Sequence, residues 1–110
     1  MPTLEECKKM VADVADEKGW GRDPNIKFLY AVTEIGEAVN LWKHRAEAGD
    51  FQVSGIPKIM EEIIDSVYYM LHAAYCIDPK TNLDEIFLEK HAVIMRRQRE
   101  YVDDRTSERR

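Results

Sequence analysis

The residues best suited to chemistry are two pairs of acids, Glu34 with Glu37 and Glu62 with Asp65, each at i, i+3 spacing. On a helix this spacing points both carboxylates of a pair to nearly the same side. Apolar residues surround each pair, and a carboxylate is costly there unless a positive charge meets it. Mg²⁺, with Mn²⁺ as a substitute, is a hard cation that prefers oxygen ligands and bridges carboxylates to phosphates. The two pairs therefore predict a divalent metal site built from two helices.

Helical phase, at about 100° per residue, separates these acids from the apolar strips of the same segments. In the segment 24–47, the predicted core strip is Phe28, Val32, Ile35, Val39 and Trp42. Its second strip is Tyr30, Glu34, Glu37 and Leu41. In the segment 57–76, the predicted core strip is Ile59, Ile63, Val67, Met70 and Ala74. Its second strip is Glu62, Asp65, Tyr69 and Cys76. Because acidic pairs are also common on solvated helices, an ordinary solvent-facing surface is the alternative to a metal site.

Two cations lie on a third apolar strip, in the segment 83–102. The predicted core strip there is Leu83, Ile86, Phe87, Val93, Ile94 and Tyr101. Lys90 and Arg97 fall on this strip, whereas Arg96 and Arg99 point elsewhere. Cations aimed at the interior that holds the acids would suit a bound polyphosphate. The alternative is that both stems lie along apolar surface with only their tips in water.

Four helices are expected to position these groups: 3–18, 24–47, 57–76 and 83–102. Thr3 and Glu6 form a capping box at the first, and Gly19 suits its left-handed end. Asp23 and Pro24 open the second as cap and first residue. Pro57 opens the third, and Thr81 or Asn82 caps the fourth. The residue between Gly19 and Gly21 is Trp20, which either anchors the connector against the core or walls a pocket for a flat ligand.

The fold class expected from these elements is all-α, a four-helix bundle in a single domain over residues 1–102. Residues 103–110 contain no apolar side chain and are expected to form a flexible tail. The second and third helices each carry two distinct strips, so one chain is not expected to cover both. We therefore predict that homo-oligomerisation completes the bundle, with a dimer as the minimal solution.

Composition excludes several function classes. The chain has 110 residues, 45% hydrophobic and 34% charged, with a net charge of −5, which does not fit a binder of nucleic-acid polymers. No run approaches the ~20 apolar residues that span a membrane. Without a signal peptide, Cys7 and Cys76 are expected to be reduced and buried in a cytoplasmic protein. No histidine follows a Glu by three positions, which excludes a di-iron bundle; each is expected at the surface or its boundary: His44, His72 and His91.

The stretches LYAVTEIGEAV (29–39) and EEIIDSVYYM (61–70) resemble the ExxE…ExxD signature of the MazG-like, all-α nucleotide pyrophosphohydrolases. The likeness extends over residues 10–101. It implies a homodimer or homotetramer that binds Mg²⁺ and cleaves nucleoside triphosphates into monophosphate and pyrophosphate. The four acids of the two pairs would be its metal ligands. Trp20, Tyr69, Lys90 and Arg97 are the substrate-binding candidates.

The chain departs from this family pattern at three places. Thr33 stands where many members have a second glutamate, and Asn40 where a third acid often follows the first pair. Lys90 is present, but Ile94 or Met95 stands where an asparagine is common. These differences leave the general base and the nucleobase contacts open, and Glu61 is the candidate for the catalytic base.

The function expected is an Mg²⁺-dependent pyrophosphohydrolase acting on (deoxy)nucleoside triphosphates, clearing non-standard or excess nucleotides. A phosphoribosyl-ATP pyrophosphohydrolase shares the architecture and the chemistry and is the first alternative. The second is a non-catalytic helical interaction module, in which the acids form salt bridges with Lys90 and Arg97.

Overall fold

The computed structural model describes residues 1–105, with side chains for residues 1–97. It contains four α-helices: α1 (Leu4–Lys18), α2 (Pro24–Lys43), α3 (Ile56–Ile77) and α4 (Leu83–Arg105). Between α2 and α3 lie a 3₁₀ turn, η1 (Arg45–Glu47), and a single π-helical turn, η2 (Phe51–Gly55). No strand occurs in the described part of the chain, so the all-α class is confirmed. The helix α4 continues past residue 102, and residues 106–110 of the expected tail lie outside the described residues.

The local end signals of the helices are confirmed. Glu6 N–H donates to Thr3 Oγ1 at 3.1 Å, and Thr3 N–H donates to Glu6 Oε1 at 3.0 Å, which completes the capping box. Gly19 ends α1 with φ of 69°, a left-handed conformation that glycine adopts without strain. Asp23 caps α2, and Asn82 rather than Thr81 caps α4 by accepting from two backbone N–H groups.

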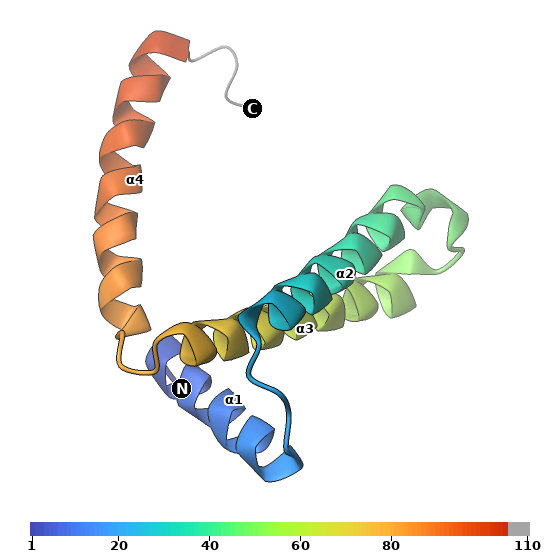
Figure 1. Cartoon of the computed structure of the whole chain (residues 1–110). Coiled ribbons are helices and arrows are strands. Elements are labelled where there is room, and N and C mark those ends of the chain that lie inside the picture. The colour runs from blue at the N-terminus through green and yellow to red at the C-terminus, as the bar shows by residue number, and fades with distance from the viewer. Residues whose placement is uncertain (106–110) are drawn as a thin grey trace.

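The helices α2 and α3 form an antiparallel hairpin, and α1 packs across α3 (Figure 1). The helix α4 contacts α1 where it begins and then rises away from the hairpin (Figure 1). A single chain therefore forms an open arrangement of four helices. None of the helices in the described part is long and apolar enough to cross a membrane.

The predicted core strip of α2 is wrong for a single chain. Phe28, Val32, Ile35, Val39 and Trp42 are all exposed, Val32 to 65%. The helix packs mainly against α3, so its least exposed positions mark the contact between the two helices. These positions are Lys27, Ala31, Glu34, Ala38 and Leu41. Two of them, Ala31 and Ala38, have small side chains, which allow the backbones of α2 and α3 to approach closely, while the larger apolar residues of α2 face outward.

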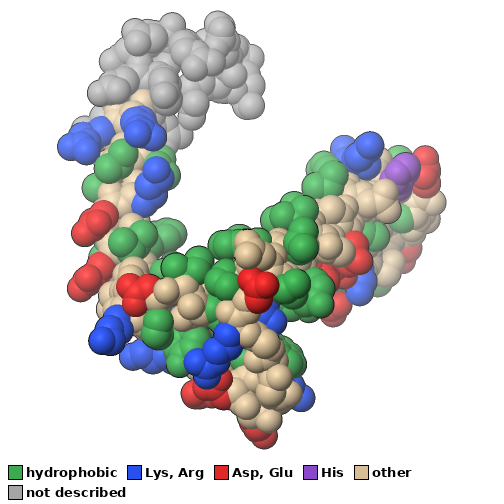
Figure 2. Space-filling view, in the orientation of Figure 1, with side chains coloured by type: hydrophobic (Ala, Val, Ile, Leu, Met, Phe, Trp, Pro, Cys, Tyr) green, Lys and Arg blue, Asp and Glu red, His purple; other side chains and the backbone are tan. Residues whose placement is uncertain are grey.

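Parts of the other predicted strips are exposed too, and hydrophobic side chains form patches on the visible surface of the α2–α3 hairpin and lie among charged ones on α4 (Figure 2). In α3, Ile59 is buried as expected but Ile63 and Met70 are exposed. In α4 the exposed members are Ile86, Phe87 and Ile94, while Tyr101 lies outside the described side chains. In α1 the buried positions are Lys8, Val11, Ala12 and Ala15. Cys7 and Cys76 are only half-buried, which corrects the expectation of full burial.

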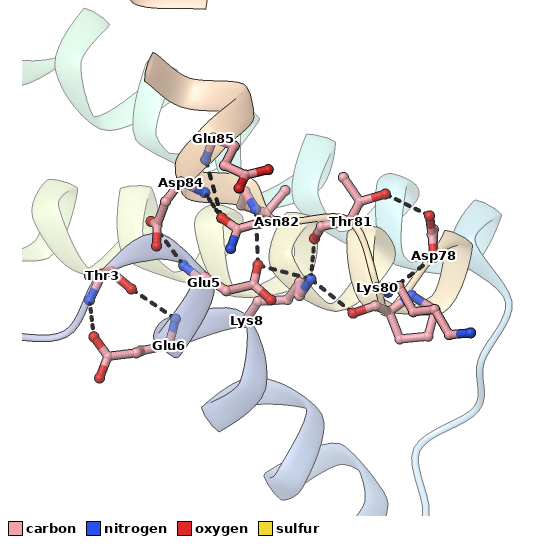
Figure 3. Close-up of polar contacts among 12 residues, drawn as sticks. Thr3, Glu5, Glu6, Lys8, Asp78, Lys80, Thr81, Asn82, Asp84 and Glu85 are labelled. Carbon is pink, nitrogen blue, oxygen red and sulfur yellow. Dashed lines mark hydrogen bonds and ion pairs between the residues drawn. The ribbon is translucent and has the colours of Figure 1, made fainter. Parts of the chain in front are cut away.

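A buried lysine joins α1 to the connector between α3 and α4 (Figure 3). Lys8 is 1% exposed, and its Nζ donates to the carbonyl oxygens of Pro79 at 3.2 Å and Thr81 at 2.6 Å. The same Nζ lies 3.0 Å from Glu5 Oε1, which also accepts from the N–H of Leu83 at 2.9 Å. The connector's carbonyls and the first N–H of α4 are thus satisfied by two side chains of α1.

We expect Lys8→Met to destabilise the chain by about 3 kcal/mol, because it leaves Glu5 and two carbonyls without their buried cation. Thermal unfolding followed by circular dichroism measures this. Lys9→Met, at the exposed neighbouring position, is the control and should change stability by less than about 0.5 kcal/mol. Equal melting temperatures for the two variants would contradict the role assigned to Lys8.

Candidate active site

Three of the four predicted metal ligands meet between the packed helices α2 and α3. Glu34 of α2 and Glu62 and Asp65 of α3 each offer an oxygen, and these oxygens lie within 4.8 Å of one another. We call these three residues the acid cluster. Glu37 lies one helical turn beyond Glu34, is exposed, and interacts with the Glu62 carboxylate. The expected convergence of the two acidic pairs is therefore present, with Glu37 at its edge.

The most buried member of the acid cluster is Glu62, at 4% exposure. Its Oε1 lies 3.1 Å from Lys58 Nζ, a cation one turn earlier on α3. Its Oε2 is buried and has no hydrogen-bond partner within the described residues. A buried carboxylate oxygen without a partner is costly, and a divalent cation held by the acid cluster would satisfy it. The residues therefore fit a hard, oxygen-liganded metal ion.

Crowding of the carboxylates shifts their pKa values in opposite directions. The neighbouring Glu62 carboxylate is the main cause that raises the pKa of Glu34 to about 7, helped by burial and by Glu37. The same interaction with Glu34, together with Glu37 and Lys58, lowers the pKa of Glu62 to about 2. The pKa of Glu37 is raised as well, chiefly by the Glu62 carboxylate. Crowding of these carboxylates thus favours retention of a proton on Glu34.

These shifts predict how metal-free stability depends on pH. The folded chain keeps the Glu34 proton up to about pH 7, whereas the unfolded chain releases it near its ordinary pKa of 4.5. Because the folded state binds more protons in this window, its stability should fall as pH rises from 4.5 to 7. Below pH 4.5 the lowered pKa of Glu62 acts the other way, since its stabilisation is lost as pH falls towards about 2.

Melting temperatures measured in EDTA across this range test the expectation. Burial is the main cause that lowers the pKa of His72. The stability that neutral His72 contributes therefore rises with pH, which opposes the trend expected from Glu34. Because both chains contain His72, its effect cancels in the difference in melting temperature between the wild-type chain and Glu34→Gln. That difference should shift in favour of the variant between pH 4.5 and 7, and saturating Mg²⁺ should abolish the shift. A difference independent of pH would show that Glu34 does not retain a proton.

Aromatic side chains stand beside the acid cluster. A pocket of about 290 Å³ is lined by Glu34 and Asp65 together with Trp20, Tyr68 and Tyr69. Trp20 packs edge-on against Tyr68, with ring centroids 6.3 Å apart, and Tyr69 lies 5.2 Å from Tyr30. The structure thus brings two predicted substrate-binding residues, Trp20 and Tyr69, next to the acids.

The other predicted site residues are elsewhere in a single chain. Lys90 and Arg97 are exposed on α4, which rises away from the hairpin, so they do not reach the acid cluster. Glu61 is exposed on α3, with Lys58 as the nearest cation at 3.8 Å, and lies outside the acid cluster. The side chain of Arg99 lies outside the described residues.

Sequence reasoning missed three polar residues near the site, of which Lys27 and His72 are buried and Lys58 is exposed. Lys58 precedes Glu62 by four residues, and this i, i+4 spacing was a readable signal. Lys27 lies among the aromatic rings, and its place on the strip of Tyr30 and Glu34 was the signal for it. His72 is 2% exposed and packs 6.0 Å from Trp20, which corrects the expected surface position, while His44 and His91 are exposed as predicted.

Comparison with known proteins identifies no relative: no family model, no curated protein and no solved structure matches this chain. The features that bear on function are the acid cluster, the aromatic pocket beside it and the two acidic motifs.

Proposed function

We propose that the chain is an Mg²⁺-dependent pyrophosphohydrolase that cleaves (deoxy)nucleoside triphosphates into monophosphate and pyrophosphate. The observation that carries the proposal is the acid cluster, in which Glu34, Glu62 and Asp65 meet within 4.8 Å and the buried Glu62 Oε2 has no partner. Carboxylates from two helices next to an aromatic pocket supply both parts that a nucleotide needs. The motif resemblance to MazG-like enzymes points the same way.

Each part of the site has a distinct task in this proposal. Glu34, Glu62 and Asp65, with Glu37 at the edge, hold Mg²⁺, which when bound neutralises phosphate charge and favours attack by water. Trp20 and Tyr69 offer ring faces on which a flat base can stack. The pocket that both rings share with Glu34 and Asp65 orients the triphosphate towards the metal. Glu61 stays the candidate base by its position one residue before Glu62, although its exposed side chain must turn towards the site to act.

We further propose that a second copy of the chain completes the site. Both helices of the hairpin carry several exposed apolar residues, a pattern typical of surfaces buried in a four-helix bundle. The helix α4 combines exposed apolar residues with Lys90 and Arg97, whereas the hairpin carries the acid cluster. This complementarity of charge favours an arrangement in which α4 of one copy covers the hairpin of the other and delivers both cations to its phosphates.

The alternative of a salt-bridged interaction module has less support. Within the described residues, the cation that meets the acid cluster is Lys58 and not Lys90 or Arg97. An interaction module also offers no reason for a partnerless carboxylate oxygen beside an aromatic pocket.

The deciding experiment is a screen for pyrophosphate release from standard and modified (deoxy)nucleoside triphosphates and from phosphoribosyl-ATP, with Mg²⁺ or with EDTA. The proposal predicts metal-dependent release from at least one nucleoside triphosphate. Release from phosphoribosyl-ATP alone would favour the related enzyme. Absence of release, together with a melting temperature that Mg²⁺ and Mn²⁺ do not raise in a saturable way, would reject both.

A further inference from the structure

A second and larger pocket, of about 470 Å³, lies at the start of α2. It shares Trp20 and Tyr69 with the pocket at the acid cluster, so the two are neighbours. The wall also includes Tyr30 and Lys27. Its volume falls within the range of ~300–1,000 Å³ that is typical of small-molecule sites.

Lys27 is the unusual member of this wall. The residue is only 6% exposed, and its Nζ lies 5.9 Å from the ring centre of Trp20 and 6.0 Å from that of Tyr30. Within the described residues it forms no ion pair and no hydrogen bond, in contrast to the buried Lys8. The lysine stem is therefore buried while its ammonium lies at the pocket wall, and aromatic faces at these distances satisfy an ammonium only in part.

The other charged groups of the wall already have partners. Arg22 pairs with Asp16 at 2.7 Å, and Asp23 accepts the N–H of Asn25 as the cap of α2. Within the described residues, Lys27 is therefore a charged donor of this pocket that forms no ion pair and can meet a ligand. The surrounding rings favour a flat ligand that places a hydrogen-bond acceptor at the ammonium.

We propose that this pocket binds the nucleobase of the substrate and that Lys27 donates to an exocyclic carbonyl oxygen of that base. This inference rests on the proposed function and names its substrate class: nucleotides of oxo-bases, such as uracil or guanine. The base stacks on Trp20 and the tyrosine rings while the phosphates extend to the acid cluster. Adenine carries an amino group at the edge where guanine carries O6, so it would set a donor against the ammonium and leave Lys27 unpaired. A site built around one hydrogen bond rejects the ligand that lacks it.

Calorimetric titration of the full chain in Mg²⁺ with UMP, GMP and AMP tests the proposal, since monophosphates are not turned over. The wild-type chain should bind UMP and GMP at least about tenfold more tightly than AMP. Lys27→Met should weaken UMP and GMP binding by about tenfold and change AMP binding by less than twofold, and Lys27→Arg should restore part of the preference. Lys43→Met, at an exposed lysine of the same helix, should leave all three affinities unchanged. Equal affinities for the three nucleotides, or equal losses for all of them in Lys27→Met, would overturn the assignment.

Thermal unfolding separates this role from a structural one. Methionine fills the space of the lysine stem without burying a charge, so Lys27→Met should melt at the same temperature as wild type or higher. A lower melting temperature would make Lys27 a structural residue. The two proposals fail separately: base preference that depends on Lys27 without pyrophosphate release rejects the hydrolase, and pyrophosphate release with unchanged affinities in Lys27→Met rejects the role of Lys27.

Discussion

Replacing Glu62 by glutamine is expected to reduce Mg²⁺-dependent pyrophosphate release by at least about a thousandfold while the helical content stays unchanged. Glu62 is the buried centre of the acid cluster, and its Oε2 is the oxygen that lacks a partner. The amide keeps the size of the side chain but loses the charge that a hard cation requires. Asp65→Asn and Glu37→Gln should act in the same direction, and the loss should be smaller for Glu37 because it lies at the edge.

Two measurements separate loss of metal from loss of fold. Circular dichroism should report unchanged helix, since glutamine also relieves repulsion with Glu34. Mg²⁺ at ~100 times its dissociation constant should stabilise the wild-type chain by about 2.7 kcal/mol and leave Glu62→Gln unaffected. Glu89→Gln, at an exposed acid of α4, is the matched control and should behave as wild type. Full activity of Glu62→Gln or Asp65→Asn at limiting Mg²⁺ would contradict the assignment of the ligands.

The helices and their ends were predictable because their signals are local. Thr3, Gly19 and Asp23 act within one turn of their own positions, so no knowledge of the fold was needed to place them. The meeting of Glu34 with Glu62 and Asp65 was also predictable, since helical phase puts each acid on one strip and a short connector sets the two helices side by side.

The choice of the buried strip was not predictable in the same way. In α2, phase separates an apolar strip from one with Lys27 and Glu34, and hydrophobicity alone assigns the apolar strip to the core. In the structure, small residues such as Ala31 and Ala38 form the contact with α3, while Val32 faces outward. The hydrophobic pattern identifies the apolar face of a helix but not whether the helix packs on that face within its own chain.

Buried lysines were missed for a related reason. A lysine in a sequence is expected at the surface, and only the folded chain reveals partners that are distant in sequence. Lys8 bonds to carbonyls more than 70 positions away, at Pro79 and Thr81. Lys27 lies beside Trp20, which belongs to the preceding connector.

The outward-facing apolar strip of α2 is expected to form the contact between two copies of the chain. Val32 and Val39 are both exposed and lie i, i+7 on that strip. We expect the wild-type chain to be a homodimer or tetramer. The double variant Val32→Asp, Val39→Asp should have a dissociation constant at least about a thousandfold higher, because each copy must then bury two carboxylates in place of apolar groups. Light scattering at micromolar concentration measures the mass. Met10→Asp, at an exposed apolar position of α1, is the control and should leave the mass unchanged. A monomeric wild-type chain with full activity would contradict the proposed assembly.

Mixing two inactive variants tests whether α4 acts on the other copy. Glu62→Gln disables the acid cluster but keeps Arg97, whereas Arg97→Ala keeps the acid cluster but lacks the cation. If α4 completes the site of its partner, a mixed dimer contains one site with both an intact acid cluster and Arg97. Activity should then return on mixing, towards about a quarter of the wild-type level, since half of the dimers are mixed and each has one working site. Glu62→Gln mixed with Asp65→Asn is the control, because every acid cluster in that mixture is defective. If the first mixture recovered no more activity than the control, Arg97 would not complete the site of the other copy.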